Sequence, residues 1–406
     1  MLKYKIINLF FYFVLFSSFI HSVLRMSPES SFSLYRILIP FSLLFFFVHL
    51  QKYSKIFFFF FIFIFYNFLI ALIYSDNLNF YIIQTFHHIS ILNILLIIYY
   101  LVKNAEYYSI YKFLRFFALS SIITAIFQII FNFRLPNTAE YFDGSVSAFN
   151  WNQNELGTAL LGFTPLLLVF ERNNIFKYIF LSFLILIFYI NDSKLSLIGL
   201  FIALFFYFFK KNILEFNKYL KLSIIVLIPL IFLVLLLLPY DGIIIPFRDY
   251  DISLGELLFE PLKQISNLQP FQDSAGSIAS RANAIIFSII ELKNSYFLGI
   301  GSGNSLLLLE KSEYILKSAK SMHNLPFQLI VEHGIFIFVL FTLLFIYFIR
   351  LIYKQNLTKI ELLKFITIPS IFIGSMGSSI GIFSNYFFIC CLFFIILLNS
   401  KESYYE

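Results

Sequence analysis

Long apolar runs alternate with short polar segments along the chain of 406 residues, and this pattern predicts helices that cross a membrane. A bilayer core needs about 20 consecutive apolar residues per helix. We expect about twelve such spans, at residues 6–24, 34–50, 56–74, 82–102, 110–131, 154–171, 174–190, 195–209, 220–238, 325–350, 361–380 and 382–399. The chain is therefore predicted to be an all-α polytopic membrane protein that forms a single integral membrane domain over residues 1–406.

One connection between the spans is long and polar. It covers residues 239–323, between the ninth and tenth predicted spans. From Arg281 onward, apolar residues recur at helical spacing, while Arg281, Ser288 and Glu291 share the opposite face. This pattern predicts an amphipathic helix on the membrane surface. An arginine in its first turn, beside free backbone N–H groups, suits a phosphate or diphosphate, and contact with lipid headgroups is the alternative interpretation.

Composition supports the membrane assignment. The chain is 60% hydrophobic and only 13% charged, which lies outside the range of soluble globular proteins. The net charge of +7 does not indicate nucleic-acid binding, because the location of the charges matters more than their sum. The two cysteines, Cys390 and Cys391, are adjacent in an apolar run and predict no disulfide framework.

The distribution of the 29 Lys and Arg residues orients the spans. Cytoplasmic loops of membrane proteins carry an excess of positive charge. With the N-terminus in the cytoplasm, most of the basic residues fall in inner segments, and the short outer loops hold only Arg25, Arg36, Arg134 and Lys194. Both termini are therefore expected in the cytoplasm, and the 239–323 connection is expected outside it.

The segment that begins at His323 combines helix-start signals with polar residues. Asn324 suits the cap of the following span and Pro326 suits its first turn, which leaves His323 at the outer mouth of the helix. Asn324, Gln328 and Glu332 recur every four residues and form a polar stripe on an apolar helix. Such residues usually face the bundle interior and are often functional. The alternative for His323 is a surface histidine without a role.

Other polar positions have simpler interpretations. Two further stripes, Gln84 with His87 and His88, and Ser121 with Thr124 and Gln128, are expected to form hydrogen bonds between helices. The glycine run at residues 299–303 is expected to be a turn between two surface helices. No combination of His, Cys and carboxylate residues has the spacing of a metal site, so no metal is predicted.

Four motifs together resemble the O-antigen ligase/polymerase family of bacterial membrane glycosyltransferases, over about residues 145–350. They are the segments 147–157, 192–194, 280–303 and 323–334. In order, these contain Phe-Asn-Trp-Asn-Gln-Asn, Asp-Ser-Lys, Ser-Arg followed by Leu-Gly-Ile-Gly-Ser-Gly, and His-Asn separated by nine residues from Gly334. Lys194 stands where the family usually has arginine, which keeps the positive charge but loses the bidentate fork.

The resemblance implies a GT-C-like helical fold in the bacterial inner membrane and an enzyme that needs neither metal nor cofactor. Its donor would be a glycan on undecaprenyl diphosphate, and transfer to a sugar hydroxyl would take place on the periplasmic face. The resemblance points to Arg281 and His323 as catalytic residues. Lys194, Arg134, Asn324 and Asn154 are expected to bind the diphosphate or the rest of the substrate.

The acceptor is left open by these motifs. A ligase transfers the glycan to lipid A–core, a polymerase transfers it to a second lipid-linked repeat, and a third kind of enzyme transfers it to protein. A lipid-glycan transporter or flippase is the alternative from another class. It is disfavoured because the sequence has no internal repeat and its charged groups gather at the outer mouth rather than at the midplane.

Overall fold

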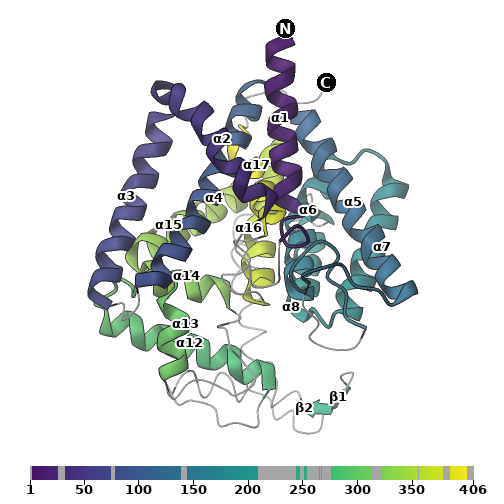
Figure 1. Ribbon diagram of the computed structural model, residues 1–406. Coiled ribbons are helices and arrows are strands. Elements are labelled where there is room, and N and C mark those ends of the chain that lie inside the picture. The colour runs from purple at the N-terminus through teal and green to yellow at the C-terminus, as the bar shows by residue number, and fades with distance from the viewer. Residues whose placement is uncertain are drawn as a thin grey trace. The chain divides into compact units, whose positions relative to one another are not determined.

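The computed structural model describes residues 2–25, 33–74, 78–138, 144–208, 244–246, 251–253, 265, 267, 276–312, 322, 324–354, 356–377 and 385–399. These residues are almost entirely helical, as predicted (Figure 1). The exception in the described ranges is a short antiparallel pair, β1 (Ile244–Pro246) with β2 (Asp251–Ser253), in the long connection. The chain divides into two compact units.

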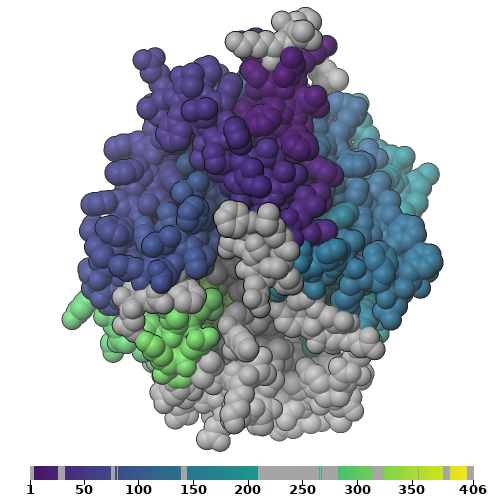
Figure 2. Space-filling view, viewed as in Figure 1, coloured from purple at the N-terminus to yellow at the C-terminus, as the bar shows by residue number. Residues whose placement is uncertain are grey.

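Unit 1 contains Met1–Tyr66, Ile82–Phe208 and Leu357–Glu406. Its helices are α1 (Leu2–Phe19), α2 (Leu34–Val48), most of α3 (Leu50–Tyr74) and α4 (Leu78–Lys103), α5 (Tyr107–Phe131), α6 (Gln153–Phe170), α7 (Asn174–Ile190), α8 (Lys194–Phe208), α16 (Lys359–Gly374), the 3₁₀ turn η1 (Ser375–Gly377) and α17 (Tyr386–Leu397). Helices α1 and α2 pack against each other, and their side chains form a continuous purple surface in Figure 2.

Helix α6 is the centre of unit 1. Nearly all of its residues are buried, and it contacts α5, α7, α8, α16 and α17. Small residues permit this close packing: a Cβ atom on Gly162 would lie 2.6 Å from the Phe388 ring of α17. Because α6 is covered on all sides, its N-terminal turn is held firmly against the neighbouring helix ends.

Unit 2 contains Asn67–Tyr81 and Phe209–Asn356. Its described helices besides the ends of α3 and α4 are α12 (Gly276–Asn294), α13 (Asn304–Lys311), α14 (Leu325–His333) and α15 (Ile335–Tyr353). Apolar side chains of the first three helices and their connections form one core, made of Ala284, Phe287, Ile300, Leu309, Met322 and Val331.

The prediction of one span over residues 325–350 is wrong. The segment forms two helices that meet at Gly334, whose φ of +53° lies in the left-handed region. A Cβ atom there would collide with the backbone of Phe297 and Leu298, so only glycine fits. With nine residues, α14 is about 14 Å long, too short to cross a bilayer core.

Five helices in the described ranges are long and apolar enough to cross a membrane, which supports a multi-pass membrane protein. They are Leu50–Tyr74, Tyr81–Lys103, Tyr107–Phe131, Ile335–Tyr353 and Lys359–Gly377, and five shorter apolar helices accompany them. The predicted span at 220–238 lies outside the described residues. The number of twelve spans and the GT-C-like fold stay predictions.

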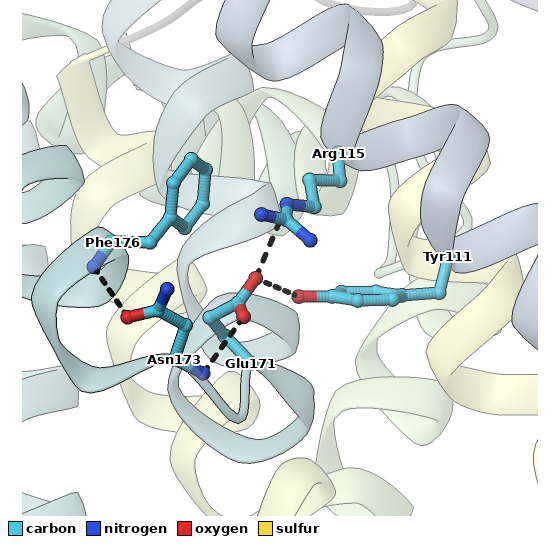
Figure 3. A network of polar contacts seen from close by, with 5 residues as sticks. All are labelled: Tyr111, Arg115, Glu171, Asn173 and Phe176. Atoms are coloured by element: carbon cyan, nitrogen blue, oxygen red, sulfur yellow. Dashed lines mark hydrogen bonds and ion pairs between the residues drawn. The ribbon is translucent and has the colours of Figure 1, made fainter.

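A polar network joins α5 to the connection between α6 and α7 (Figure 3). The Glu171 carboxylate lies 3.2 Å from Arg115 Nε, and it accepts hydrogen bonds from the Tyr111 hydroxyl at 3.3 Å and from the Asn173 amide at 3.0 Å. The Asn173 side chain in turn accepts from the amide of Phe176 at 3.1 Å and caps α7. The Arg115 guanidinium carbon lies 4.1 Å from the centre of the Phe176 ring.

We expect Glu171→Ala to destabilise unit 1. Glu171 is buried, and its loss leaves Arg115 and two other donors without their acceptor, which costs about 2 kcal/mol. The apparent melting temperature of the purified protein in detergent should therefore fall by several degrees. Glu310→Ala, at an exposed position of α13, is the control and should have little effect. Equal shifts in the two variants would contradict the role given to the network.

Candidate functional site

The motif segment 147–157 is held in unit 1 by side-chain amides from three other helices. Gln128 of α5 accepts hydrogen bonds from the backbone amides of Ser147 and Ala148, at 3.2 and 2.8 Å. The Gln128 side chain is therefore part of the framework. Hydrogen bonds between helices were predicted for its stripe, whereas these partners of Gln128 lie in a loop.

Two asparagines at helix ends complete this support. Asn191, the C-cap of α7, exchanges two hydrogen bonds with the backbone of Val146, at 2.8 and 2.9 Å. Asn385, the N-cap of α17, donates to Asn150 Oδ1 at 2.7 Å and to the Glu155 carbonyl at 3.0 Å. The C-terminal ends of α5 and α7 and the N-terminal ends of α6 and α17 thus meet at one end of unit 1. The predicted topology assigns all four of these helix ends to one side of the membrane.

Helix α6 begins within the motif. Asn152 is its N-cap and accepts from the Glu155 amide at 2.9 Å, while the Glu155 carboxyl accepts from the Trp151 amide at 3.3 Å. Asn154, predicted to bind substrate, is half-buried in the first turn, and its carbonyl accepts from the Thr158 hydroxyl at 2.9 Å.

Lys194 is the first residue of α8, and its ammonium lies 3.3 Å from the Asp192 carboxylate. Both side chains are partly exposed, so solvent weakens this ion pair and a phosphate can compete with it. A Cβ atom on Gly157 would lie 2.7 Å from Ser196 Oγ, which shows that the first turns of α6 and α8 are packed together. Lys194 and Asn154 therefore lie at adjacent helix starts.

Arg134 lies in the connection after α5 and is half-buried. Like Lys194 and Asn154, it belongs to unit 1, whereas Arg281 and Asn324 belong to unit 2. The side chain of Arg281 and the whole of His323 lie outside the described residues, so the predicted catalytic pair stays a prediction.

Two expectations about the helix that carries Arg281 are wrong. Helix α12 begins at Gly276, so Arg281 lies in its second turn and not beside the free N–H groups of the first. The face with Ser288 is not the solvent face: Ser288 is fully buried and its hydroxyl donates to the Ala284 carbonyl at 2.7 Å, while Ile289 is 38% exposed. Helix α12 turns this face to the protein core because it packs on α14.

Asn324 stands at the N-cap position of α14, and Pro326 lies in the first turn, as predicted. The expected cap is not formed, because the Asn324 side chain makes no hydrogen bond to the first turn. The side chain is 2% exposed, and Oδ1 has no hydrogen-bond partner among the described residues. Asn324 therefore has a buried acceptor available for a substrate or for a neighbouring group.

The rest of the predicted polar stripe forms a buried network. Glu332 Oε1 accepts from the Ser305 hydroxyl at 2.5 Å and from the Gln328 amide at 3.3 Å, and Gln328 also donates to Ser305 Oγ at 3.0 Å. Burial raises the pKa of Glu332 to about 7, although the hydrogen bonds from Ser305, the Gly303 backbone and Gln328 oppose this rise. Glu332 thus joins α13 to α14, as a protonated acid at mildly acidic pH.

The glycine run does more than the predicted turn. Gly299, Gly301 and Gly303 all have φ between +81° and +90° and connect α12 to α13. Within the run, the Ile300 amide donates to the Val331 carbonyl and the Gly301 amide to the Glu332 carbonyl, both at 2.9 Å. The run therefore attaches α12 to the end of α14.

Sequence reasoning missed the partner of His333. Its Nδ1 lies 2.6 Å from Asn67 Oδ1, which also accepts from the Ser302 hydroxyl at 3.3 Å. Asn67 is a single amide in the apolar run of α3, and that isolation is the signal that could have singled it out. These three buried side chains attach α3 to the glycine run and α14.

We expect the free energy of unfolding of the Glu332→Gln variant to depend less on pH than that of the wild type. Because the native pKa of about 7 exceeds the value of 4.5 for an exposed carboxyl, the native state holds this proton more tightly than the unfolded state. Wild-type stability should therefore decline between about pH 4.5 and 7, by on the order of 3 kcal/mol from this group. Melting temperatures at pH 5 and pH 8 measure the effect. Glu310→Gln should show the same change in melting temperature between the two pH values as the wild type. If Glu332→Gln also shows the wild-type change, the raised pKa of Glu332 is contradicted.

In the described ranges, no group of three or more His, Cys, Asp or Glu side chains is arranged to hold a metal ion. No curated protein matches the chain. The model of the family described as O-antigen ligase matches residues 179–342, from within α7 to within α15. This segment includes Lys194, Arg281 and His323, and it contains three of the four motifs. The resemblance predicted from those motifs is confirmed over residues 179–342, which are similar to the O-antigen ligase family.

Proposed function

We propose that this multi-pass membrane protein is a glycosyltransferase of the O-antigen ligase type. It would transfer a glycan from undecaprenyl diphosphate to a sugar hydroxyl of lipid A–core, on the periplasmic face of the inner membrane. The observation that carries the proposal is the family match over residues 179–342, which includes Lys194, Arg281 and His323 in one segment.

The chemistry needs positive charge at the leaving group. The bond between the sugar carbon and the diphosphate oxygen breaks, the acceptor oxygen bonds to that carbon, and the acceptor proton leaves. Negative charge grows on the diphosphate, and fixed cations that face it stabilise the transition state. Arg281 and Lys194 would supply these cations without a metal, and Arg134 would bind the same diphosphate or the glycan.

The contacts around Lys194 and Asn324 support their roles. The Lys194 ammonium is held 3.3 Å from Asp192 at a partly exposed position, from which it can turn to a phosphate oxygen. Asn324 keeps a buried Oδ1 without a partner among the described residues, next in sequence to His323. A buried acceptor of this kind suits a hydroxyl donor on the substrate. Asn154, in the first turn of α6, would contact the glycan.

His323 has two possible tasks in this reaction. A neutral imidazole can take the proton of the acceptor hydroxyl, whereas a protonated one can bind a phosphate. The pH profile of kcat separates the two, because a base loses activity below its pKa and a cation loses activity above it.

Arg281→Ala and His323→Ala are each expected to reduce glycan transfer about 100-fold or more, since each removes a group that acts on the transition state. Transfer is measured with the purified protein, a lipid-linked donor and rough lipopolysaccharide, with protein amount and monodispersity checked for every variant. Arg350→Ala, at an exposed position in the last turn of α15, is the matched control. Full activity of both variants would refute the site.

The glycan profile of a deletion strain distinguishes the ligase from the polymerase, which the same family match also fits. We expect lipid A–core without any attached glycan, while long chains accumulate on the carrier lipid. A core that carries a single repeat would instead identify a polymerase. If the lipid-linked glycan is chemically unaltered but does not reach the periplasm, the protein is a transporter. If glycan is lost from protein alone, it is a protein glycosyltransferase.

A further inference from the structure

Two arginines from different elements of unit 1 lie in one cluster with two histidines. Arg25 ends the turn after α1, and Arg36 lies in the first turn of α2. The positive charges of both guanidinium groups disfavour protonation of the His21 and His87 imidazoles. The rings of His21 and Tyr386 form one wall of the cluster, with their centres 5.3 Å apart.

His21 brings a buried nitrogen without a partner to this cluster. The side chain is 1% exposed, Nδ1 lies 2.5 Å from Ser33 Oγ, and Nε2 has no hydrogen-bond partner among the described residues. Burial lowers the pKa of His21 to about 2, and Arg25, Arg36 and His87 lower it further in the same direction. His21 is therefore neutral at pH 7. When the Ser33 hydroxyl donates to Nδ1, Nε2 carries the hydrogen and needs an acceptor.

Arg36 has the same need. Arg36 Nε is buried and has no hydrogen-bond partner in the described part of the chain, although the Tyr386 hydroxyl lies beside the guanidinium. The guanidinium carbon of Arg25 lies 5.4 Å from the centre of the Trp151 ring. Burial lowers the pKa of Arg25, and the Glu155 carboxyl opposes that effect. The Glu155 carboxyl that acts on Arg25 already accepts a hydrogen bond from the Trp151 amide.

Helix α2 adds a further preference for negative charge. Its N-cap Ser33 makes no hydrogen bond to the first turn, because its hydroxyl is bonded to His21. The free N–H groups of a helix start favour an anion, and a cation such as Arg36 in that first turn is unfavourable unless an anion is bound. Among the described residues, Arg36 Nε and His21 Nε2 therefore lack an acceptor, and one that carries negative charge and several oxygens would suit both.

We propose that Arg25, Arg36 and His21 bind a phosphate group at this end of unit 1. A phosphate offers enough oxygen acceptors for two guanidinium groups and an imidazole N–H. Tyr386 and His87 lie at its border, and Glu155 holds the loop that carries Trp151. The phosphate could belong to a soluble phosphate compound or to the headgroup of a membrane lipid. The inference concerns binding alone and does not depend on the proposed transfer reaction.

Trp151 gives a direct probe, because it is the only tryptophan in the chain and stacks near Arg25. The full-length protein in an uncharged detergent is titrated with inorganic pyrophosphate at constant ionic strength. We expect a saturable change in tryptophan fluorescence. Arg25→Gln and Arg36→Gln should each raise the apparent Kd about tenfold, which corresponds to a loss of 1.4 kcal/mol. Arg172→Gln, at an exposed position between α6 and α7, should bind like the wild type.

A second arm identifies the source of the phosphate. The protein is placed in nanodiscs of phosphatidylcholine alone or with phosphatidylglycerol. If a lipid headgroup occupies the site, phosphatidylglycerol alters the Trp151 fluorescence and weakens pyrophosphate binding. If the site takes a soluble phosphate, pyrophosphate binds equally in both discs. Either outcome supports a phosphate site, and the two outcomes name different sources.

A measurement on the wild type covers the case in which an arginine variant does not fold. Phenylglyoxal modifies accessible arginines, and mass spectrometry reads each position. Pyrophosphate or phosphatidylglycerol should protect Arg25 and Arg36 but not Arg172. The proposal is overturned if neither probe changes the fluorescence or the protection, or if the folded glutamine variants bind like the wild type.

Discussion

Inside a membrane protein, buried polar groups must find their partners within the chain, because hydrocarbon offers none. This constraint explains most polar side chains in the described helices. In unit 1, Gln128, Asn191 and Asn385 satisfy the backbone of a loop that lies among helix ends. In unit 2, Gln328 and Ser305 donate hydrogen bonds to one oxygen of the Glu332 carboxyl. A polar residue in an apolar run is thus first a structural element, and its role in chemistry needs further evidence.

One kind of further evidence is a buried polar atom that has no hydrogen-bond partner among the described residues. The constraint makes such an atom costly, so its retention requires a compensating ligand or role. Asn324 Oδ1 meets this criterion in unit 2, while Arg36 Nε and His21 Nε2 meet it in unit 1. Gln328 does not, because its amide donates to two groups. Gln128 Nε2 and Glu332 Oε2 also lack a partner among the described residues, although both side chains belong to the framework. An unpartnered atom therefore marks a candidate site only where other observations point to a ligand.

The sequence predicted the helical class, most helix ranges and the family segment, because apolar periodicity and local motifs determine these. It could not predict the break at Gly334, since a glycine in a long apolar run also occurs inside continuous helices. The face of α12 was misjudged because a fully buried Ser288 looks polar in sequence, although its hydroxyl is satisfied within its own helix. Arg25 and Arg36 were counted only as outer charges, because their convergence depends on tertiary packing.

In unit 2, a close backbone contact between the glycine run at residues 299–303 and the end of α14 connects two of the sequence motifs. The glycine run can approach α14 only because Cβ atoms are absent: one on Gly299 would lie 2.6 Å from the Gly334 amide nitrogen and 2.8 Å from the Glu332 carbonyl oxygen. The motif that contains Gly299 and the motif that contains Gly334 therefore pack against each other at this contact. Since α12 ends just before this contact and α14 ends in it, the contact fixes the helix of Arg281 against the helix that Asn324 begins. The glycines act on the candidate site by holding these two helices together, without touching a substrate.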